Sequence, residues 1–407
     1  MLSQSDQRKL ELSEFKLNSL LDLTLAINAN KSAHELLQKF RDILCPNLNV
    51  KRIAVFSVNQ DWKKVLSENC SDYFGNNADE ISSALLLFKD VSKVNKKEFP
   101  LFANFDIIIP VYHKEFPLAF VLLGKDAESQ QFGSMFDHLR IIQTLSNIVI
   151  VAMENKRLYR KALEQESLKK ELEVASNLQS MLIPSADSLP KNNFLHIASF
   201  YQPHSMVGGD YYDFMQLRNN EYGFCIADVS GKGISAAILM SNFQANLRIL
   251  LKRNIPLPNL IRELNQNVNQ SSHGDRFVTF FVGKYNGDSK ILHYINAGHN
   301  PPLLLHKSEM VYLTNGCVGL GMLDEIPKIT VGTISIDSGD KLLCFTDGLI
   351  EAENFEKRDF GTIPIEGAIT IDGNADDIVY SLRKELEHFL NGEPTNDDIS
   401  IMGIDFL

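Results

Sequence analysis

The second half of the sequence carries four motifs in which an aspartate stands at the end of an apolar stretch, beside a glycine or a sharp turn. The aspartates are Asp210 in VGGDYYDF, Asp228 in IADVSGKG, Asp347 in FTDG, and the pair Asp397 and Asp398 in NDDIS. Hard divalent cations prefer several oxygen ligands, and aspartate supplies them on a short stem. A neighbouring glycine lets backbone carbonyls approach an ion and permits a positive φ at the turn. Together the four motifs predict a site for divalent cations.

Such a site has a specific chemistry. Two divalent ions a few ångströms apart can share a carboxylate and a hydroxide, an arrangement suited to in-line attack on phosphorus. Taken singly, the motifs are weaker, since Asp-Gly is typical of a turn and a double aspartate of a solvated loop. The segment Gly231-Lys232-Gly233 lacks the first glycine of a phosphate-binding loop and the Ser or Thr that follows its lysine. A nucleotide-binding P-loop is therefore disfavoured.

The composition argues against several other classes. The chain has 407 residues, with 40 Lys and Arg against 51 Asp and Glu, and this net charge of −11 disfavours general nucleic-acid binding. Five cysteines form no CxxC pair, which favours a reduced, cytoplasmic compartment. None of them stands in a phosphate-cradling loop, which disfavours a cysteine nucleophile. The start lacks the apolar stretch of a signal peptide, and the apolar stretches near 105–111 and 148–153 are too short to span a membrane. We expect a cytoplasmic protein of two or three domains, with no membrane span and no nucleic-acid partner.

The elements that must position the aspartates are predicted over residues 185–407. Apolar, β-branched stretches predict strands at 194–201, 222–227, 277–285, 291–296 and 341–345, and helical periodicity predicts helices at 234–252, 258–269 and 375–390. Strands and helices come in runs instead of strict alternation. The pattern indicates an α+β domain with antiparallel sheets.

Residues 1–150 predict a different domain. Leucines at helical spacing predict a helix over the first ~30 residues. A second helix starts at Ser32, which caps it reciprocally with Glu35, and Pro46 stops it. Residues 105–112 and 118–123 predict a hairpin, and a long helix begins near Phe136.

The long helix is expected to run to Leu182, so that residues 151–184 form a helical linker. On a seven-residue frame two positions form a seam, occupied by Val151, Leu158, Gln165, Leu172 and Gln179, and by Glu154, Lys161, Leu168, Ala175 and Leu182. Six of these ten are apolar, which predicts a parallel coiled-coil dimer with an imperfect seam. The alternative is a solvated linker helix that lies on one domain.

The set VGGDYYDF, IADVSGKGISAA, NAGHNPPLLL, FTDGLIEAEN and NDDISIM resembles the SpoIIE-type branch of the metal-dependent PPM (type 2C) serine/threonine protein phosphatases. The resemblance covers about residues 182–407. It implies an α–β–β–α sandwich with a centre of two Mn²⁺ or Mg²⁺ ions, and it implies that the domain hydrolyses phosphoserine or phosphothreonine. The resemblance also implies a partner-switching role, with a STAS-domain anti-sigma-factor antagonist as the commonest substrate type.

By position, the resemblance also assigns ligand roles. Asp228 matches the carboxylate that bridges both ions, and Val229 matches the residue whose backbone carbonyl completes the second ion. Asp347 and Asp397 match ligands of the first ion, with Asp398 as the fallback for Asp397. Asp210 matches the acidic residue near the second ion, bound directly or through water.

Two further residues stay open. His299 is a candidate general acid for the leaving alkoxide, or a structural histidine that holds the turn before Pro301. Lys232 is a candidate for steering phosphate, or an ordinary solvated loop lysine. The start of the segment offers no arginine to clamp the phosphate.

The N-terminal part, over about residues 20–159, resembles a GAF domain with an α/β/α fold that feeds a signalling helix. The Asn of the cyclic-nucleotide type is missing where the sequence reads Leu123-Gly124-Lys125-Asp126, so cyclic-nucleotide binding is disfavoured. The sequence thus predicts a cytoplasmic, homodimeric phosphatase of a phosphoprotein, controlled by its GAF-like domain. The alternatives are a binding module that keeps the fold with weak catalysis, and a metal-dependent hydrolase of small phosphates.

Overall fold

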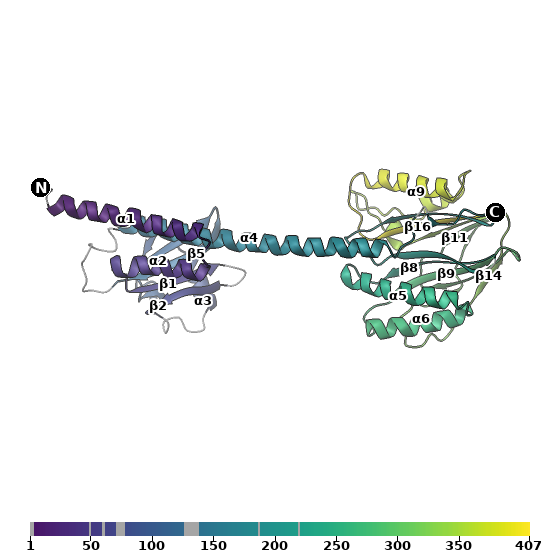
Figure 1. Cartoon of the computed structure of the whole chain (residues 1–407), viewed down its shortest axis with the longest axis horizontal. Helices are drawn as coiled ribbons and strands as arrows, with labels where there is room; N and C mark the ends of the chain where they lie inside the picture. Colours follow the sequence, from purple (N-terminus) through teal and green to yellow (C-terminus); the bar gives the residue numbers. More distant parts are fainter. Residues whose placement is uncertain are drawn as a thin grey trace. The chain divides into compact units, whose positions relative to one another are not determined.

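The computed structural model of the chain describes residues 4–48, 50–58, 62–70, 78–125, 138–185, 188–218 and 220–407. Its contacts divide the chain into an N-terminal unit, Met1–Glu166, and a C-terminal unit, Ser167–Leu407 (Figure 1). Helix α4 (Leu139–Ser180) is continuous through this division. It confirms the long helix, whose expected start near Phe136 lies outside the described residues. The domain boundaries at 150 and 184 stay predictions.

The N-terminal unit is built around one antiparallel sheet. Its strands are β1 (Arg52–Val58), β2 (Trp62–Glu68), β3 (Ser92–Lys93), β4 (Ile107–His113) and β5 (Phe116–Gly124), in the order β2-β1-β5-β4-β3. Strands β4 and β5 form the predicted hairpin, and Lys114 takes a positive φ in its turn. The helices are α1 (Gln4–Asn28), α2 (Ala33–Asn47), α3 (Ala78–Leu85) and the 3₁₀ turn η1 (Pro100–Phe102).

Helices cover both faces of this sheet. Successive side chains of a strand point to opposite faces, so each strand contributes to two separate clusters. Ile53 and Val55 pack in a cluster with α1, α2 and the first turns of α4. Ala54 and Phe56 pack in the opposite cluster with α3 and η1. The layers agree with an α/β/α arrangement, whereas the GAF-like identity of this unit stays a prediction.

Helix α2 begins with the predicted capping box and ends later than expected. The Ser32 side chain accepts from the Glu35 backbone N–H at 3.2 Å, and Glu35 Oε2 accepts from the Ser32 N–H at 2.8 Å. Pro46 does not stop the helix, which continues to Asn47. The Asn47 side chain donates to the Ile43 carbonyl, and Leu48, which is buried, donates its N–H to the Leu44 carbonyl. These bonds hold the last turn in place of the donor that proline lacks.

The C-terminal unit holds two sheets. The first has the order β13-β10-β9-β8-β7, with β14 beside β10, and consists of β7 (Tyr211–Arg218), β8 (Glu221–Val229), β9 (Val278–Asn286), β10 (Ile291–Ala297), β13 (Gly316–Cys317) and β14 (Gly332–Ser335). The second has the order β12-β11-β15-β16-β6 and consists of β6 (Leu195–Gln202), β11 (Leu303–His306), β12 (Glu309–Tyr312), β15 (Lys341–Phe345) and β16 (Ile399–Phe406).

Helices cover the outer face of each sheet, which gives the α–β–β–α sandwich that the resemblance implies (Figure 1). Helices α5 (Ile234–Lys252) and α6 (Leu257–Ser272) pack on the first sheet, and α8 (Ile363–Ile369) and α9 (Ala375–Leu390) pack on the second. The short helix α7 (Asp347–Ile350) follows β15 directly.

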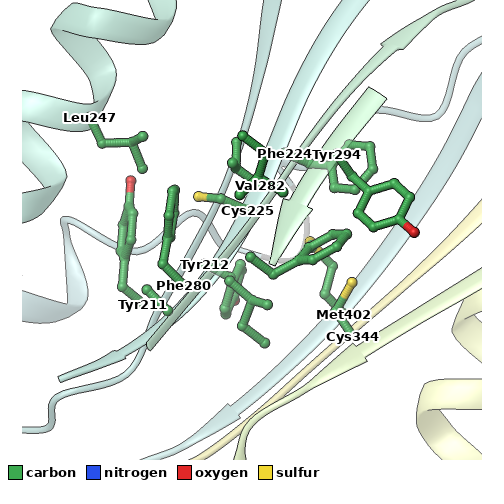
Figure 2. Close-up of a cluster of buried hydrophobic side chains, with 14 of the residues drawn as sticks. Tyr211, Tyr212, Phe224, Cys225, Leu247, Phe280, Val282, Tyr294, Cys344 and Met402 are labelled. Carbon is green, nitrogen blue, oxygen red and sulfur yellow. The ribbon is translucent and has the colours of Figure 1, made fainter. Parts of the chain in front are cut away.

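The period of two along each strand sorts its side chains between the sandwich interior and the helices. In β16, Met402, Ile404 and Phe406 join the cluster that fills the space between the sheets, whereas Ile399 and Ile401 pack towards α9. Figure 2 shows Phe224 of β8 together with Cys344 and Met402 of the second sheet in the first of these clusters. The strands that carry the acidic motifs are therefore held firmly by a core on both faces.

One helix in the described part of the chain is long and apolar enough to cross a membrane by length and composition, namely α5. Half of its apolar window is buried, and Met240, Phe243 and Leu247 lie in the hydrophobic core of the C-terminal unit. A core helix passes the same test, so the length of α5 does not by itself indicate a membrane span.

Candidate metal centre

The acidic motifs lie at strand ends of both sheets. Asp210 directly precedes β7, and Asp228 is the last residue but one of β8. Asp347 begins α7 after β15, and Asp397 and Asp398 directly precede β16. By the period of two, Asp228 shares the inner face of β8 with Phe224, which lies opposite the second sheet.

Hydrogen bonds tie the two sheets together at this point. Thr346 Oγ1 donates to Asp210 Oδ2 at 2.8 Å and accepts from the Ser400 backbone N–H at 2.9 Å. The Thr346 N–H donates to the Ser400 carbonyl at 3.1 Å. One threonine thus fixes the acidic end of β7 against β15 and β16. The sequence analysis did not single out Thr346, although it stands inside FTDG, directly before Asp347.

The carboxylates are close enough to raise one another's pKa. Burial, together with the charges of Asp347 and Asp397, raises the pKa of Asp228 to about 7. Burial and the charges of Asp228 and Asp398 hold the pKa of Asp210 well above its usual range. Burial and the charge of Asp397 raise the pKa of Asp347. Crowded, half-desolvated carboxylates of this kind are costly to ionise unless a cation joins them.

Two glycines let the backbones come together here. A Cβ atom on Gly348 would stand 2.0 Å from the Asp398 carbonyl oxygen, so only glycine allows the Asp347 turn to approach the start of β16. A Cβ atom on Gly209 would stand 2.8 Å from the Val229 carbonyl oxygen, so the loop before Asp210 lies directly on that carbonyl. Both close approaches place an aspartate beside a backbone oxygen of the other motifs.

The two members of the double aspartate have different surroundings. Asp398 is buried, and its Oδ1 and Oδ2 accept backbone N–H groups of His204 and Gly209 at 2.8 and 2.6 Å. Asp397 is about two-fifths exposed, and its Oδ2 lies 2.8 Å from Lys232 Nζ. Asp398 therefore holds the loop before Asp210, while the Asp397 carboxylate is held by a flexible, half-exposed lysine.

Lys232 is half-exposed and forms an ion pair with Asp397, and its role in steering phosphate stays a prediction. Besides Asp397, its ammonium group donates to the Asn396 carbonyl, so it spans from the IADVSGKG loop to the NDDIS motif. Arg276 holds the same loop from the other side, because its Nη1 donates to the Ser230 carbonyl and its Nη2 donates to Ser235 Oγ at 2.7 Å. Arg276 was not singled out from the sequence, since it lies in none of the five motifs.

His299 is buried in a way that favours the structural alternative. Its Nδ1 lies 2.9 Å from Thr279 Oγ1, and its Nε2 is buried without a hydrogen-bond partner among the residues that the structure describes. Desolvation lowers the pKa of the imidazole to about 4, so the ring is neutral near pH 7. Asn296 closes the turn, since its side chain accepts from the His299 N–H and donates to the His299 carbonyl. A buried neutral ring is a poor proton donor to a leaving group.

The donor set fits hard divalent cations. Carboxylate and carbonyl oxygens from four motifs gather at one end of the sandwich, and burial together with neighbouring charges has raised the pKa of three of the carboxylates. Within the described ranges, no group of three or more His, Cys, Asp or Glu side chains is arranged to hold an ion as it stands.

Comparisons with known proteins agree with this reading of the C-terminal unit. Residues 218–407 match the family model described as Stage II sporulation protein E (SpoIIE). Phosphoserine phosphatase RsbU of Bacillus subtilis is 29% identical over 188 residues, which cover 46% of this chain and 55% of RsbU. Protein IcfG of Synechocystis sp. is 27% identical over 263 residues, which cover 58% of this chain and 41% of IcfG. The chain thus spans about half the length of these curated relatives.

A solved structure supports the fold. The SiaA-PP2C domain of Pseudomonas aeruginosa is similar with a TM-score of 0.53 and 18% sequence identity, and the match covers 60% of this chain and 100% of that domain. At this identity the likeness concerns the fold alone. Together with the four acidic motifs at one end of the sandwich, the match over residues 218–407 makes the C-terminal unit of this chain similar to the SpoIIE family, and the solved structure shows that its fold is like that of a PP2C domain.

Proposed function

We propose that this chain is a metal-dependent protein serine/threonine phosphatase that hydrolyses phosphoserine or phosphothreonine on a signalling protein. The observation that carries the proposal is the gathering of five aspartates at facing strand ends in a domain similar to the SpoIIE family. The naming of RsbU as a phosphoserine phosphatase supports the same reaction class. By analogy with that branch, the proposed substrate is a phosphorylated STAS-domain regulator.

In this proposal two Mn²⁺ or Mg²⁺ ions would be held, with Asp228 as a ligand of both. Asp347 and Asp397 would be further ligands of the first ion, and the Val229 carbonyl and Asp210 would be further ligands of the second. Asp398 stays a positioning residue, because backbone N–H groups occupy both of its oxygens. When bound, two such ions supply a water of lowered pKa and neutralise the phosphate charge.

The residues of the chain then have separate tasks. Thr346 and Asp398 orient the carboxylates through the hydrogen bonds that they make across the sheets. Lys232 stands at the half-exposed edge of the cluster, where its charge can meet a phosphate once Asp397 turns to an ion. His299 is left with a structural role, since it is buried and neutral.

Regulation and location are further parts of the proposal. The N-terminal unit, as a GAF-like domain, and helix α4 would join two copies in a cytoplasmic homodimer and control the order of the metal centre. Exposed leucines on α4, such as Leu158 and Leu168, support a helix-to-helix contact. Gln179 is not counted in the predicted seam, because its side chain is buried within its own C-terminal unit.

The test uses the full chain. We expect hydrolysis of p-nitrophenyl phosphate that requires Mn²⁺ or Mg²⁺ and is lost in Asp228→Asn. A panel of phosphoserine proteins, including a phosphorylated STAS domain, is compared with a panel of nucleotides and sugar phosphates. The proposal is supported if phosphate is released from the phosphoproteins and not from the nucleotides or sugar phosphates. Faster release from small phosphates would replace it with the small-phosphate hydrolase, and inactivity with every metal and substrate would favour a binding module.

A further inference from the structure

The last turn of α4 reaches the loop that precedes Asp210. Gln179 Nε2 donates to the Gly208 carbonyl at 2.6 Å, and the Gly208 N–H donates to Gln179 Oε1 at 3.0 Å. The side chain is 7% exposed. An amide side chain has one donor group and one acceptor group side by side, so it pairs with both polar groups of Gly208 at once. The pair thus fixes both the position and the orientation of this stretch of backbone.

The opposite side of the same loop is held by Asp398. The Gly209 N–H donates to Asp398 Oδ2, and a Cβ atom on Gly208 would stand 2.3 Å from that oxygen and 2.5 Å from Tyr201 Oη. The backbone of Gly208 and Gly209 is therefore clamped between an amide from α4 and a carboxylate from the NDDIS motif. Asp210 is the next residue, so the clamp fixes where its carboxylate stands.

We propose that Gln179 is a positioning residue for metal binding, which holds the loop 207–210 so that Asp210 and the Val229 carbonyl face the same ion. The inference rests on the proposed function for the identity of the ligands. Removing the amide leaves a buried N–H and a buried carbonyl without partners, and the loop can satisfy them only by moving. Mutation of a residue that hydrogen-bonds to the ligands of a metal site, or to the backbone that carries them, typically weakens metal binding by about 10- to 100-fold.

The position of Gln179 on α4 gives this contact a regulatory use. Helix α4 is continuous from Leu139, and its early residues Ile142, Leu145 and Val149 pack in the core of the N-terminal unit. A shift or rotation of the last turn of α4 would withdraw the amide from Gly208. The loop before Asp210 is therefore the point at which a movement of this helix reaches the metal centre.

The experiment compares Gln179→Met with Gln165→Met in the full chain. Methionine keeps the length of glutamine and removes both hydrogen bonds, and Gln165 is an exposed residue of the same helix at the same seam position. Hydrogen exchange of peptides over 204–212 is measured without metal, and Mn²⁺ affinity is measured by calorimetry without substrate. We expect faster exchange in this segment and about 10- to 100-fold weaker Mn²⁺ binding for Gln179→Met, with no change for Gln165→Met.

The outcomes separate this inference from the proposed function. Unchanged exchange and unchanged Mn²⁺ affinity in a folded Gln179→Met variant would overturn the role of Gln179. Failure of the wild-type chain to bind Mn²⁺ would overturn the proposed metal centre instead. If Gln179→Met does not fold, Gln179→Glu is measured in the same way, since it keeps the acceptor for the Gly208 N–H and loses the donor to the Gly208 carbonyl. Wild-type affinity in Gln179→Glu would contradict the inference.

Discussion

The two units of this chain differ in what their sheets bury. In the N-terminal unit both faces of the sheet are filled by apolar side chains, with Phe120 against Trp62 and Tyr112 on one face. In the C-terminal unit the sandwich buries aspartates as well, among them Asp210, Asp213 and Asp398. Among the described residues, every buried aspartate belongs to the C-terminal unit.

The buried and half-buried aspartates of the C-terminal unit differ in their partners, and the difference shows where the fold loses stability. Asp213 is matched by a bidentate ion pair with Arg248 of α5, at 2.7 and 3.0 Å, which compensates its burial. Asp210 and Asp228 face other carboxylates, and their pKa values are raised. A buried charge with a partner supports a fold, whereas crowded like charges cost stability and are typical of functional sites.

The largest effect is expected at Asp347. Asp347→Asn removes a proposed ligand of the first ion, and we expect the turnover of p-nitrophenyl phosphate at saturating Mn²⁺ to fall by on the order of 1,000-fold. The matched control is Asp340→Asn, a buried aspartate whose Oδ2 accepts the Asp337 N–H and lies near His306 Nδ1. The control should lower thermal stability and leave the turnover unchanged. Equal losses in both variants would mean that Asp347 only supports the fold.

In the absence of metal, removal of a crowded carboxylate is expected to increase the stability of the fold. The pKa of Asp228 is raised to about 7 from the ordinary 3.8, so this carboxyl group stays protonated to higher pH in the folded chain than in the unfolded chain. Ionisation therefore destabilises the fold increasingly from about pH 4 to pH 7, and the cost stays constant above. At pH 8 we expect Asp228→Asn to stabilise the metal-free chain by on the order of 3 kcal/mol.

Thermal unfolding in a chelator at pH 8 and pH 4 measures this change. The stabilisation should disappear at pH 4, where Asp228 is protonated in the folded chain. Adding Mn²⁺ should reverse the order of the two proteins, because only the wild type gains the full binding energy. A destabilised Asp228→Asn variant at pH 8 would contradict the picture of crowded carboxylates.

A smaller effect is expected at Gly348. Gly348→Ala places a Cβ atom 2.0 Å from the Asp398 carbonyl oxygen, so the backbone between Asp347 and β16 has to move apart. We expect a loss of about 1–3 kcal/mol in unfolding free energy, together with weaker Mn²⁺ binding by calorimetry. The control is Gly367→Ala in α8, where no atom of the described residues outside the neighbouring helix backbone lies within 4 Å of the added Cβ atom. That variant should be neutral or slightly stabilised.

The smallest effect is expected at Lys232. Its ion pair with Asp397 is half-exposed on both sides, and such pairs contribute about 0–1 kcal/mol. Lys232→Met frees the Asp397 carboxylate, so we expect Mn²⁺ to bind up to about fivefold more tightly, as titrated by calorimetry without substrate. Lys384→Met, which removes an exposed ion pair on α9, is the control and should have no effect. Weaker Mn²⁺ binding in Lys232→Met would show that the lysine supports the site instead of competing for it.

Much of the fold could be predicted from local pattern. The bounds of α5, α9 and β15 agree with the helical and apolar periods of the sequence, and the hairpin of β4 and β5 was visible from its two apolar stretches. The capping box of α2 depends on Ser32 and Glu35 alone. Helix α2 nevertheless passes Pro46, because the packing of Leu48 and the bond from Asn47 extend it beyond the local rule.

The acidic motifs were also visible in the sequence, because each aspartate is flanked by the apolar strand and the glycine that position it. The amino-acid sequence by itself thus determined the strands, the helices and the carboxylates available for a metal centre. These features depend on residues that are close together in the chain, so their signal is local.

Only the tertiary structure decided how these residues meet. The ion pair of Lys232 with Asp397, the bond of Thr346 to Asp210, and the burial of His299 join positions far apart in the chain. Gln179 shows this most clearly, since its helical spacing placed it on a dimer seam, whereas packing directs it to Gly208. A side chain at one seam position can be buried against any surface that its helix meets. Which surface this is depends on the folding of the whole domain, and it cannot be predicted from the helical periodicity of the sequence.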